Sequence, residues 1–358
     1  MTIGVLKEPQ SETRVSLLPE HLLILKKLNV DILVENNCGE KSFASDEKYA
    51  EAGGIIVSRN EVLNKSEIIL TIHLPLESEI HLLQSKIILG IYQPFYHQDF
   101  IKKLKEKDVT IFSIDMIPRT TRAQSMDVLS SQANIAGYKA VLVAANLIPR
   151  YFPMLMTAAG SIPPARVLIL GAGVAGLQAI ATARRLGAVV EVFDTRPAVK
   201  EEVMSLGAKF IEVEGAADAS KAGGYAVEQS TPFLQKQKEK IAASVAKSDI
   251  IITTAQIFGK KAPILVTEEM IGTMKNGSVI IDVAAATGGN TSITKNDETV
   301  IYDGVTIVGN SNLPATMPFD ASKVYGKNIC NFLQLIIDKD GQLNLNLEDD
   351  LVRGTLIS

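Results

Sequence analysis

Short apolar runs alternate with amphipathic stretches over the first 120 residues of the chain. The apolar runs predict strands at residues 3–6, 31–34, 67–72, 87–91 and 109–114. Between them the pattern predicts helices, one opened by Pro19 and another that begins at Asp46 and ends at Gly53. Strands that alternate with helices build a parallel sheet covered by helices.

A long helix separates this first pattern from a second one. Residues 126–148 contain good helix formers and stop at Pro149, which predicts a helix of about six turns that joins two domains. A stronger α/β pattern follows, and residues 322–337 predict one more helix that packs back on the first domain. We therefore expect an α/β fold with two Rossmann-like domains, each with a parallel sheet. The expected domains are residues 1–135 plus 320–358, and residues 140–318.

A glycine-rich turn lies where the second pattern begins. Residues 166–170 predict a strand, and a GxGxxG motif with a helix-forming stretch follows at once. In such a turn the first glycine makes the bend, the second lets the backbone approach a pyrophosphate, and the third packs the helix on the strand. The amino terminus of the helix adds free N–H groups for phosphates. The residues expected to contact a dinucleotide here are Gly171, Gly173, Val174, Ala175 and Gly176.

A carboxylate ends the next predicted strand. Residues 188–193 are followed by Asp194, 18 residues beyond Gly176, where a carboxylate accepts both ribose hydroxyls of an adenosine and repels a 2′-phosphate. NAD is therefore favoured over NADP, although Arg196 lies close enough to serve a 2′-phosphate. The alternative is that Asp194 is only a solvated turn residue.

Three further strands are predicted at residues 249–254, 278–283 and 305–308. Ligands of such sheets bind at the carboxyl ends of the strands, so residues 254–256, with Ala255 and Gln256, and residues 284–286 are expected near the cofactor. Small residues there would leave space for a nicotinamide ring. Small residues at strand ends are also common without any function.

Composition narrows the function classes. The 358 residues carry a formal net charge of −4, which argues against a nucleic-acid partner. Cys38 and Cys330 show no metal-ligand spacing, and we expect no metal. The amino terminus lacks the pattern of a secretory signal, and the longest uncharged stretch, 167–183, is shorter than a membrane span. Any membrane association is therefore expected to come from partners.

A polar cluster at residues 119–132 resembles a loop of one known family. With residues 136–141, 171–176, 194–197 and 223–226, it is similar to the NAD(H)-binding component of proton-translocating NAD(P) transhydrogenases, in the alanine dehydrogenase/transhydrogenase superfamily. The resemblance implies NAD(H) on this chain, NADP(H) on a partner, and hydride transfer coupled by membrane-embedded subunits to proton translocation. It also implies a homodimer, cytoplasmic and peripheral on the inner membrane through those subunits.

The resemblance also assigns site residues. Residues expected to act at the nicotinamide end are Arg119, Gln124, Asp127 and Ser130. Residues expected to contact other parts of the cofactor are Arg122, Thr195, Arg196, Gly224 and Tyr225. Gly224 and Tyr225 match a loop that closes over the bound nucleotide in that family. The alternative for the first group is structural: Asp127 caps the helix and Arg119 pairs with it.

Alanine dehydrogenase is the rival within the same superfamily. Arg14 fits its substrate-carboxylate arginine, but the positions expected to match its catalytic lysine, histidine and aspartate hold His73, Gln93 and Ala286. Making and reducing an imino acid needs acid–base groups, whereas hydride transfer between two nicotinamides needs none. His73 could still act as a substitute acid or base. A non-catalytic NAD-binding protein is the third alternative.

Overall fold

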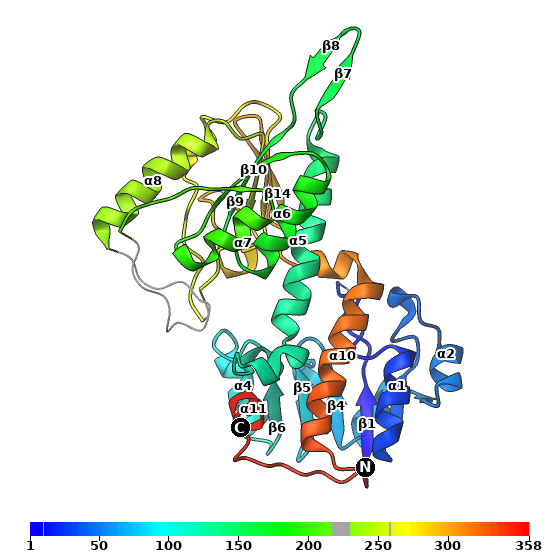
Figure 1. Cartoon of the computed structure of the whole chain (residues 1–358). Helices are drawn as coiled ribbons and strands as arrows, with labels where there is room; N and C mark the ends of the chain where they lie inside the picture. The colour runs from blue at the N-terminus through cyan, green and yellow to red at the C-terminus, as the bar shows by residue number, and fades with distance from the viewer. Residues whose placement is uncertain (10, 216–229, 258, 358) are drawn as a thin grey trace. The chain divides into compact units, whose positions relative to one another are not determined.

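The computed structural model describes residues 1–9, 11–215, 230–257 and 259–357 (Figure 1). The chain forms two compact units, Met1–Gln132 with Ala315–Ser358, and Ala133–Pro314. Helix α5, Val128–Leu147, begins in the first unit and continues in the second. The expected α/β class with parallel sheets joined by a long helix is confirmed. Compared with the predicted helix over 126–148, α5 begins two residues later, because residues up to Met126 form a 3₁₀ turn.

The first unit is built on a six-stranded sheet in the order β3-β2-β1-β4-β5-β6, and each pair is parallel. Its strands are β1 (Thr2–Val5), β2 (Asp31–Glu35), β3 (Ile55–Val57), β4 (Ile68–Leu70), β5 (Ile87–Gly90) and β6 (Thr110–Ser113). Successive side chains of a strand face opposite sides. Ile68 and Leu70 accordingly join a core with α1 (Pro19–Leu25) and α10 (Pro318–Ile336), whereas Ile69 joins a core with α3 (Arg59–Lys65) and α4 (Gln98–Lys105).

The carboxyl-terminal residues complete this unit. Helix α10 starts four residues before the predicted position, because Pro318 suits the first turn of a helix. The tail that follows carries a short helix that the sequence pattern did not predict, α11 (Asp350–Thr355). After it, Leu356 forms a bridge with Phe112 of β6, so the chain end lies at the edge of the sheet.

The second unit contains a seven-stranded sheet in the order β11-β10-β9-β12-β13-β15-β14. Its strands are β9 (Arg166–Leu170), β10 (Val189–Phe193), β11 (Lys209–Phe210), β12 (Ile250–Thr253), β13 (Val279–Asp282), β14 (Thr299–Tyr302) and β15 (Val305–Val308). All neighbours are parallel except β14 and β15. Helix α6 (Val174–Arg185) follows β9 directly, as the glycine motif predicted.

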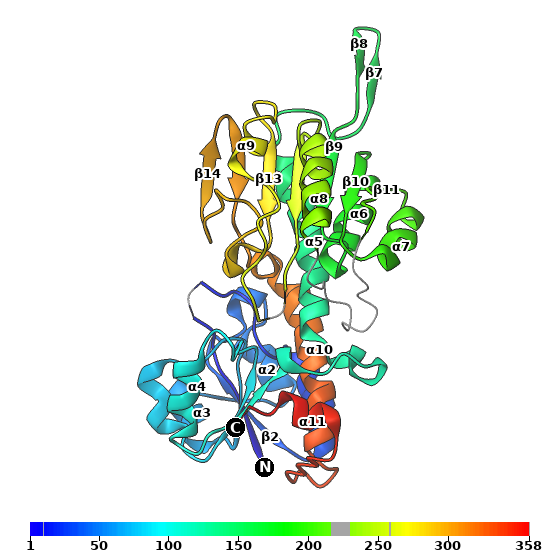
Figure 2. The same cartoon turned by 90° about the vertical axis from the view of Figure 1, so that its left-hand side faces the viewer.

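A two-stranded hairpin extends from the second unit, away from its sheet (Figures 1 and 2). It consists of β7 (Leu155–Thr157) and β8 (Gly160–Ile162), and the sequence pattern did not predict it. Met156 of β7 is 76% exposed, and Met154, just before β7, is 60% exposed.

Candidate functional site

The glycine turn after β9 has the geometry that a phosphate-binding turn requires. Gly171 has φ +105°, a conformation that L side chains rarely adopt. A Cβ on Gly176 would lie 1.9 Å from the carbonyl oxygen of Gly171, so only glycine allows α6 to start this close to the strand. A Cβ on Gly173 would meet nothing within 4 Å. The space beside Gly173, at the amino terminus of α6, is therefore open, as the approach of a phosphate to this turn would require.

Asp194 lies at the end of β10, beside this turn. Its Oδ2 accepts a hydrogen bond from the backbone N–H of Ala172 at 2.7 Å. Its Oδ1 accepts from the backbone N–H of Arg196 at 2.8 Å, and the Arg196 guanidinium forms an ion pair with the carboxylate. The Asp194 side chain is only 7% exposed. The alternative that Asp194 is a solvated turn residue is wrong, since the carboxylate ties the strand end to the glycine turn.

A cavity of about 210 Å³ opens beside Asp194 and Thr195. Its apolar wall is formed by Phe210, Val213 and Phe233. A pocket with an apolar wall and a carboxylate at its edge has the chemistry that a purine nucleoside needs.

A chain of buried hydrogen bonds holds the loop at the end of β12 in place. The fully buried Asp282 of β13 accepts hydrogen bonds from the backbone N–H of Asn290 at 2.7 Å and from the Thr294 hydroxyl at 2.6 Å. The Asn290 side chain then accepts from the N–H of Ala255 and donates to its carbonyl, at 3.0 and 2.8 Å. Both backbone polar groups of Ala255 are thus engaged. The Ala255 carbonyl keeps one lone pair, and the neighbouring Gln256 is exposed, so both stay predicted cofactor contacts.

The loop with the predicted nicotinamide residues belongs to the first unit. Residues Thr121–Met126 form a 3₁₀ helix whose Ala123 and Met126 are buried, while Arg119 and Gln124 are exposed. Two amides of α10, Asn328 and Asn331, donate to the carbonyl of Ser125 and anchor the loop.

Asp127 caps helix α5. Its Oδ1 accepts from the backbone N–H of Ser130 at 2.8 Å and its Oδ2 accepts from the Ser130 hydroxyl at 2.6 Å. The structure therefore brings Asp127 and Ser130 together, in the capping arrangement weighed as the structural alternative. Arg122 is held elsewhere, by ion pairs to Asp349 and Asp350 at the start of α11. The sequence pattern did not predict this link, because the tail shows no periodicity from which α11 could be recognised.

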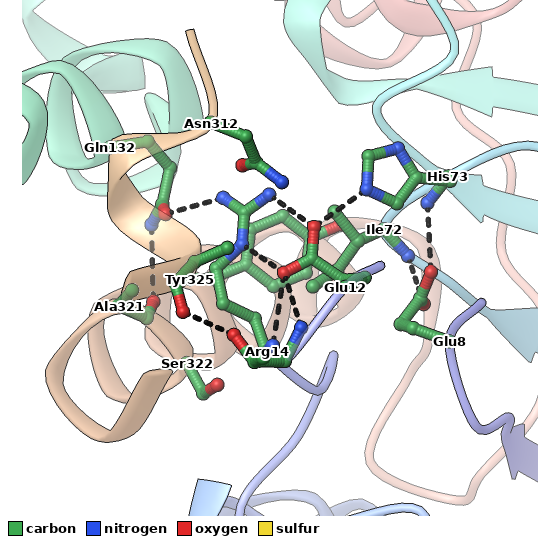
Figure 3. A network of polar contacts seen from close by, with 12 residues as sticks. Glu8, Glu12, Arg14, Ile72, His73, Gln132, Asn312, Ala321, Ser322 and Tyr325 are labelled. Carbon is green, nitrogen blue, oxygen red and sulfur yellow. Dashed lines mark hydrogen bonds and ion pairs between the residues drawn. The ribbon is translucent and has the colours of Figure 1, made fainter. Parts of the chain in front are cut away.

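A buried polar network in the first unit was only partly anticipated (Figure 3). Both oxygens of the Glu12 carboxylate accept from the Arg14 guanidinium, at 2.8 and 2.7 Å, and Arg14 also donates to the Gln132 side chain at 2.8 Å. His73 Nε2 lies 2.7 Å from Glu12 Oε2. Burial alone would raise the pKa of Glu12, but the hydrogen bonds from Arg14 and His73 outweigh it and hold the pKa well below its ordinary value.

Glu8 stands next to this network and is the residue that sequence reasoning overlooked. Its carboxylate accepts from the backbone N–H groups of Ile72 and His73, and it borders a cavity of about 230 Å³ that Thr71 and His73 also line. Burial raises the pKa of Glu8 to about 7, against the lowering effect of His73 and the two backbone hydrogen bonds. The sequence carries no signal for this pKa, which depends on burial.

Two predicted site residues, Gly224 and Tyr225, lie outside the described residues. Among the residues that are described, no group of His, Cys, Asp and Glu side chains has the arrangement of a metal site. In the same part of the chain, every helix is too short or too polar to cross a bilayer.

The fold and the turn after β9 place the chain among the Rossmann-type α/β proteins. The chain belongs to the alanine dehydrogenase/PNT family: the family's N-terminal domain matches residues 4–136 and its C-terminal domain matches residues 140–358. The C-terminal match thus includes residues 315–358, which the structure assigns to the first unit.

Proteins named transhydrogenase are similar to the chain over its whole length. The first part of the NAD(P) transhydrogenase subunit alpha of Rhodospirillum rubrum is 43% identical over 369 residues, which cover 100% of this chain and 96% of that protein. A crystal structure of the transhydrogenase from Sinorhizobium meliloti is 41% identical with a TM-score of 0.91, and the match covers 99% of this chain and 98% of that one. Alanine dehydrogenase 2 of Staphylococcus aureus is 30% identical over 328 residues, which cover 89% of this chain and 82% of that protein.

The pKa of Glu8 predicts a pH dependence of stability. It is raised from 4.5 to about 7, so the folded protein holds a proton that the unfolded chain releases between these values. This contribution to stability is complete below pH 4.5 and is lost as the pH rises through about 7. Between pH 5 and pH 8, we expect the parental free energy of unfolding to fall by on the order of 2 kcal/mol more than that of Glu8→Gln.

Urea unfolding at the two pH values measures this difference, and Glu40→Gln, at an exposed carboxylate, is the matched control. The assignment is wrong if Glu8→Gln and the parent lose the same free energy between pH 5 and pH 8.

Proposed function

We propose that this chain is the NAD(H)-binding alpha subunit of a proton-translocating NAD(P) transhydrogenase. The observation that carries the proposal is the 43% identity with the Rhodospirillum rubrum subunit over the entire chain. In this proposal residues 140–318 bind NAD(H), and hydride passes directly to or from NADP(H) on a partner subunit. The reaction needs that partner, so the chain alone does not turn over.

The adenosine and pyrophosphate end of the cofactor is assigned to the second unit. The open space over Gly173 and the amino terminus of α6 support a phosphate there. Asp194 and the apolar cavity beside it support an adenosine, with Thr195 and Arg196 at its border. Gln256 supplies the polar side chain at the end of β12.

The nicotinamide end is assigned to Arg119, Gln124, Asp127 and Ser130. Bound NAD(H) supplies the hydride donor or acceptor, and the residues of the chain orient the ring and exclude water. Exposed Gln124 carries both a donor and an acceptor, which suits a carboxamide. The assignment of Gly224 and Tyr225 to a closing loop rests on the family resemblance alone. Arg122 pairs with two aspartates but keeps a half-exposed side chain, and it stays a predicted cofactor contact on the family resemblance.

The polar network of Figure 3 speaks against amino-acid oxidation. Arg14, which would have to bind a substrate carboxylate, already has its charge balanced by the buried Glu12. His73, the one possible acid–base group among the three aligned positions, is engaged by the same carboxylate. Gln93 and Ala286 cannot transfer protons at any ordinary pH. The chain therefore lacks what an alanine dehydrogenase needs.

The partners are membrane-embedded subunits that include an NADP(H)-binding domain, and they hold this chain at the cytoplasmic face of the inner membrane. A second copy of the chain completes the assembly. The hairpin β7–β8 supports a homodimer, because it protrudes and exposes methionine side chains to water. Exposed apolar surface is unfavourable in water, and contact with a second copy of the chain would bury it.

Cofactor titration and a reconstituted assay test the function. We expect the full chain to bind NADH more tightly than NADPH and to transfer hydride only when the NADP(H)-binding partner is added. We expect no NADH formation from alanine between pH 6 and pH 10, the range over which ordinary His and Lys side chains titrate. Turnover with alanine, or with any other amino acid, would remove the transhydrogenase assignment.

Gln124→Asn tests the nicotinamide end. The change shortens the side chain by one methylene group, and a displacement of about 1 Å can slow an orientation-dependent reaction by on the order of 100-fold. We expect a large loss of hydride-transfer rate with the partner and little change in the NADH dissociation constant. Asp194→Ala should do the reverse, and Gln235→Asn, at an exposed amide of α8 (Thr231–Val245), is the matched control. A parental transfer rate in Gln124→Asn would refute the assignment.

Met156→Asp tests the homodimer. A charge at this 76% exposed position should be harmless in a monomer and should break an apolar contact between copies. Light scattering after gel filtration should therefore give a dimer for the parent and a monomer for the variant. Met204→Asp, at a 57% exposed methionine of the same unit, should remain a dimer. A dimeric Met156→Asp, or a monomeric parent, would contradict the role given to the hairpin.

A further inference from the structure

The Asp194 carboxylate has no hydrogen-bonding capacity left for a ribose. A carboxylate offers about four lone-pair positions, two on each oxygen. Oδ1 accepts from the backbone N–H and from Nε of Arg196, at 2.8 and 2.9 Å. Oδ2 accepts from the backbone N–H of Ala172 and from a terminal nitrogen of Arg196, at 2.7 and 2.8 Å. All four positions are filled from within the chain.

Two of the four donors can be exchanged and two cannot. The backbone N–H groups of Ala172 and Arg196 are fixed by the glycine turn and by the chain itself. The two guanidinium bonds depend on side-chain torsions of Arg196, which is 17% exposed. The two hydroxyls of an adenosine ribose can therefore donate hydrogen bonds to the Asp194 carboxylate only if they replace the guanidinium.

We propose that Arg196 is a specificity-determining latch, whose guanidinium occupies the carboxylate positions that the adenosine ribose of NAD(H) must take. The proposal rests on the proposed function and names what controls nucleotide choice at that same site. Binding of NAD(H) breaks the ion pair and leaves the guanidinium to solvent or to Glu202 of α7 (Lys200–Ser205), a second carboxylate whose charge acts on Arg196.

The latch changes the affinities for the two nucleotides in opposite directions. For NAD(H) the guanidinium is a competitor, so its presence weakens binding. For NADP(H) it is a benefit, because it neutralises Asp194 and can itself pair with a 2′-phosphate. Without it, a bare carboxylate would meet the phosphate. Arg196 thus reduces the selectivity for NAD(H) that Asp194 alone would give.

Arg196→Met in the full chain tests the latch. Methionine keeps an unbranched apolar stem, and the backbone N–H that orients Asp194 remains. We expect the NADH dissociation constant to fall roughly tenfold, the equivalent of one charge-assisted hydrogen bond. We expect that of NADPH to rise about threefold or more through charge repulsion. Arg196→Gln, an uncharged polar variant, should shift both constants in the same directions.

Three controls separate the latch from a structural role. Reduced nicotinamide mononucleotide lacks the adenosine, so its affinity should not change. Arg185→Met removes an exposed charge at the end of α6 and should leave all affinities as in the parent. Adding Asp194→Asn should abolish the gain in NADH affinity. An unchanged or weaker NADH affinity in both Arg196 variants, or a parallel shift of NADH and NADPH, would overturn the latch. If the parent itself fails to bind NADH, the proposed function fails instead.

Discussion

The glycine turn after β9 depends on two close backbone contacts, each of which requires a glycine. A Cβ on Gly176 would lie 1.9 Å from the carbonyl oxygen of Gly171, and a Cβ on Gly137 would lie 2.0 Å from that of Ala175. Helix α6 is therefore pressed against the end of β9 on one side and against α5 on the other. Backbone atoms cannot move aside as a flexible side chain can. This stack fixes the direction in which the amino terminus of α6 points its free N–H groups.

Buried charge organises the first unit in a different way. Glu12 and Arg14 are both nearly inaccessible to solvent, and each would be costly to bury alone. The pair is acceptable because every oxygen of Glu12 has a donor and because Gln132 takes a further guanidinium bond. Burial raises the pKa of Glu8 by more than its two backbone N–H donors lower it, whereas the hydrogen bonds from Arg14 and His73 lower the pKa of Glu12 in spite of burial. Two neighbouring glutamates thus have pKa values shifted in opposite directions.

The parts of the fold that could be predicted are those that depend on patterns among residues close together in the sequence. Buried strands such as β9 and β12 are continuous apolar runs, and the glycine turn has a fixed spacing, so both could be recognised directly. The hairpin β7–β8 could not, since it is short and exposed. Helix α11 could not either, because its buried residues Leu351, Val352 and Thr355 lie in a helix of only six residues, which is too short to show a helical period. Positions of candidate site residues along the chain were accessible in the same way, but their partners were not. The ion pair of Arg196 with Asp194 and the hydrogen bonds of Asn290 to the Ala255 backbone depend on how the folded backbone orients these side chains.

Asp127 and Ser130 illustrate why a structural role and a functional one need not exclude each other. The Asp127 carboxylate closes the first turn of α5, and a cap of this kind stabilises a helix by about 1 kcal/mol. Each of its oxygens accepts one bond from Ser130 and keeps a second lone pair, so the carboxylate can cap the helix and still accept from a carboxamide. Asp194 is the contrasting case, because its four positions are already taken. The same residue type thus offers a ready acceptor in one loop and a contested one in the other, and the difference lies in a single neighbouring arginine.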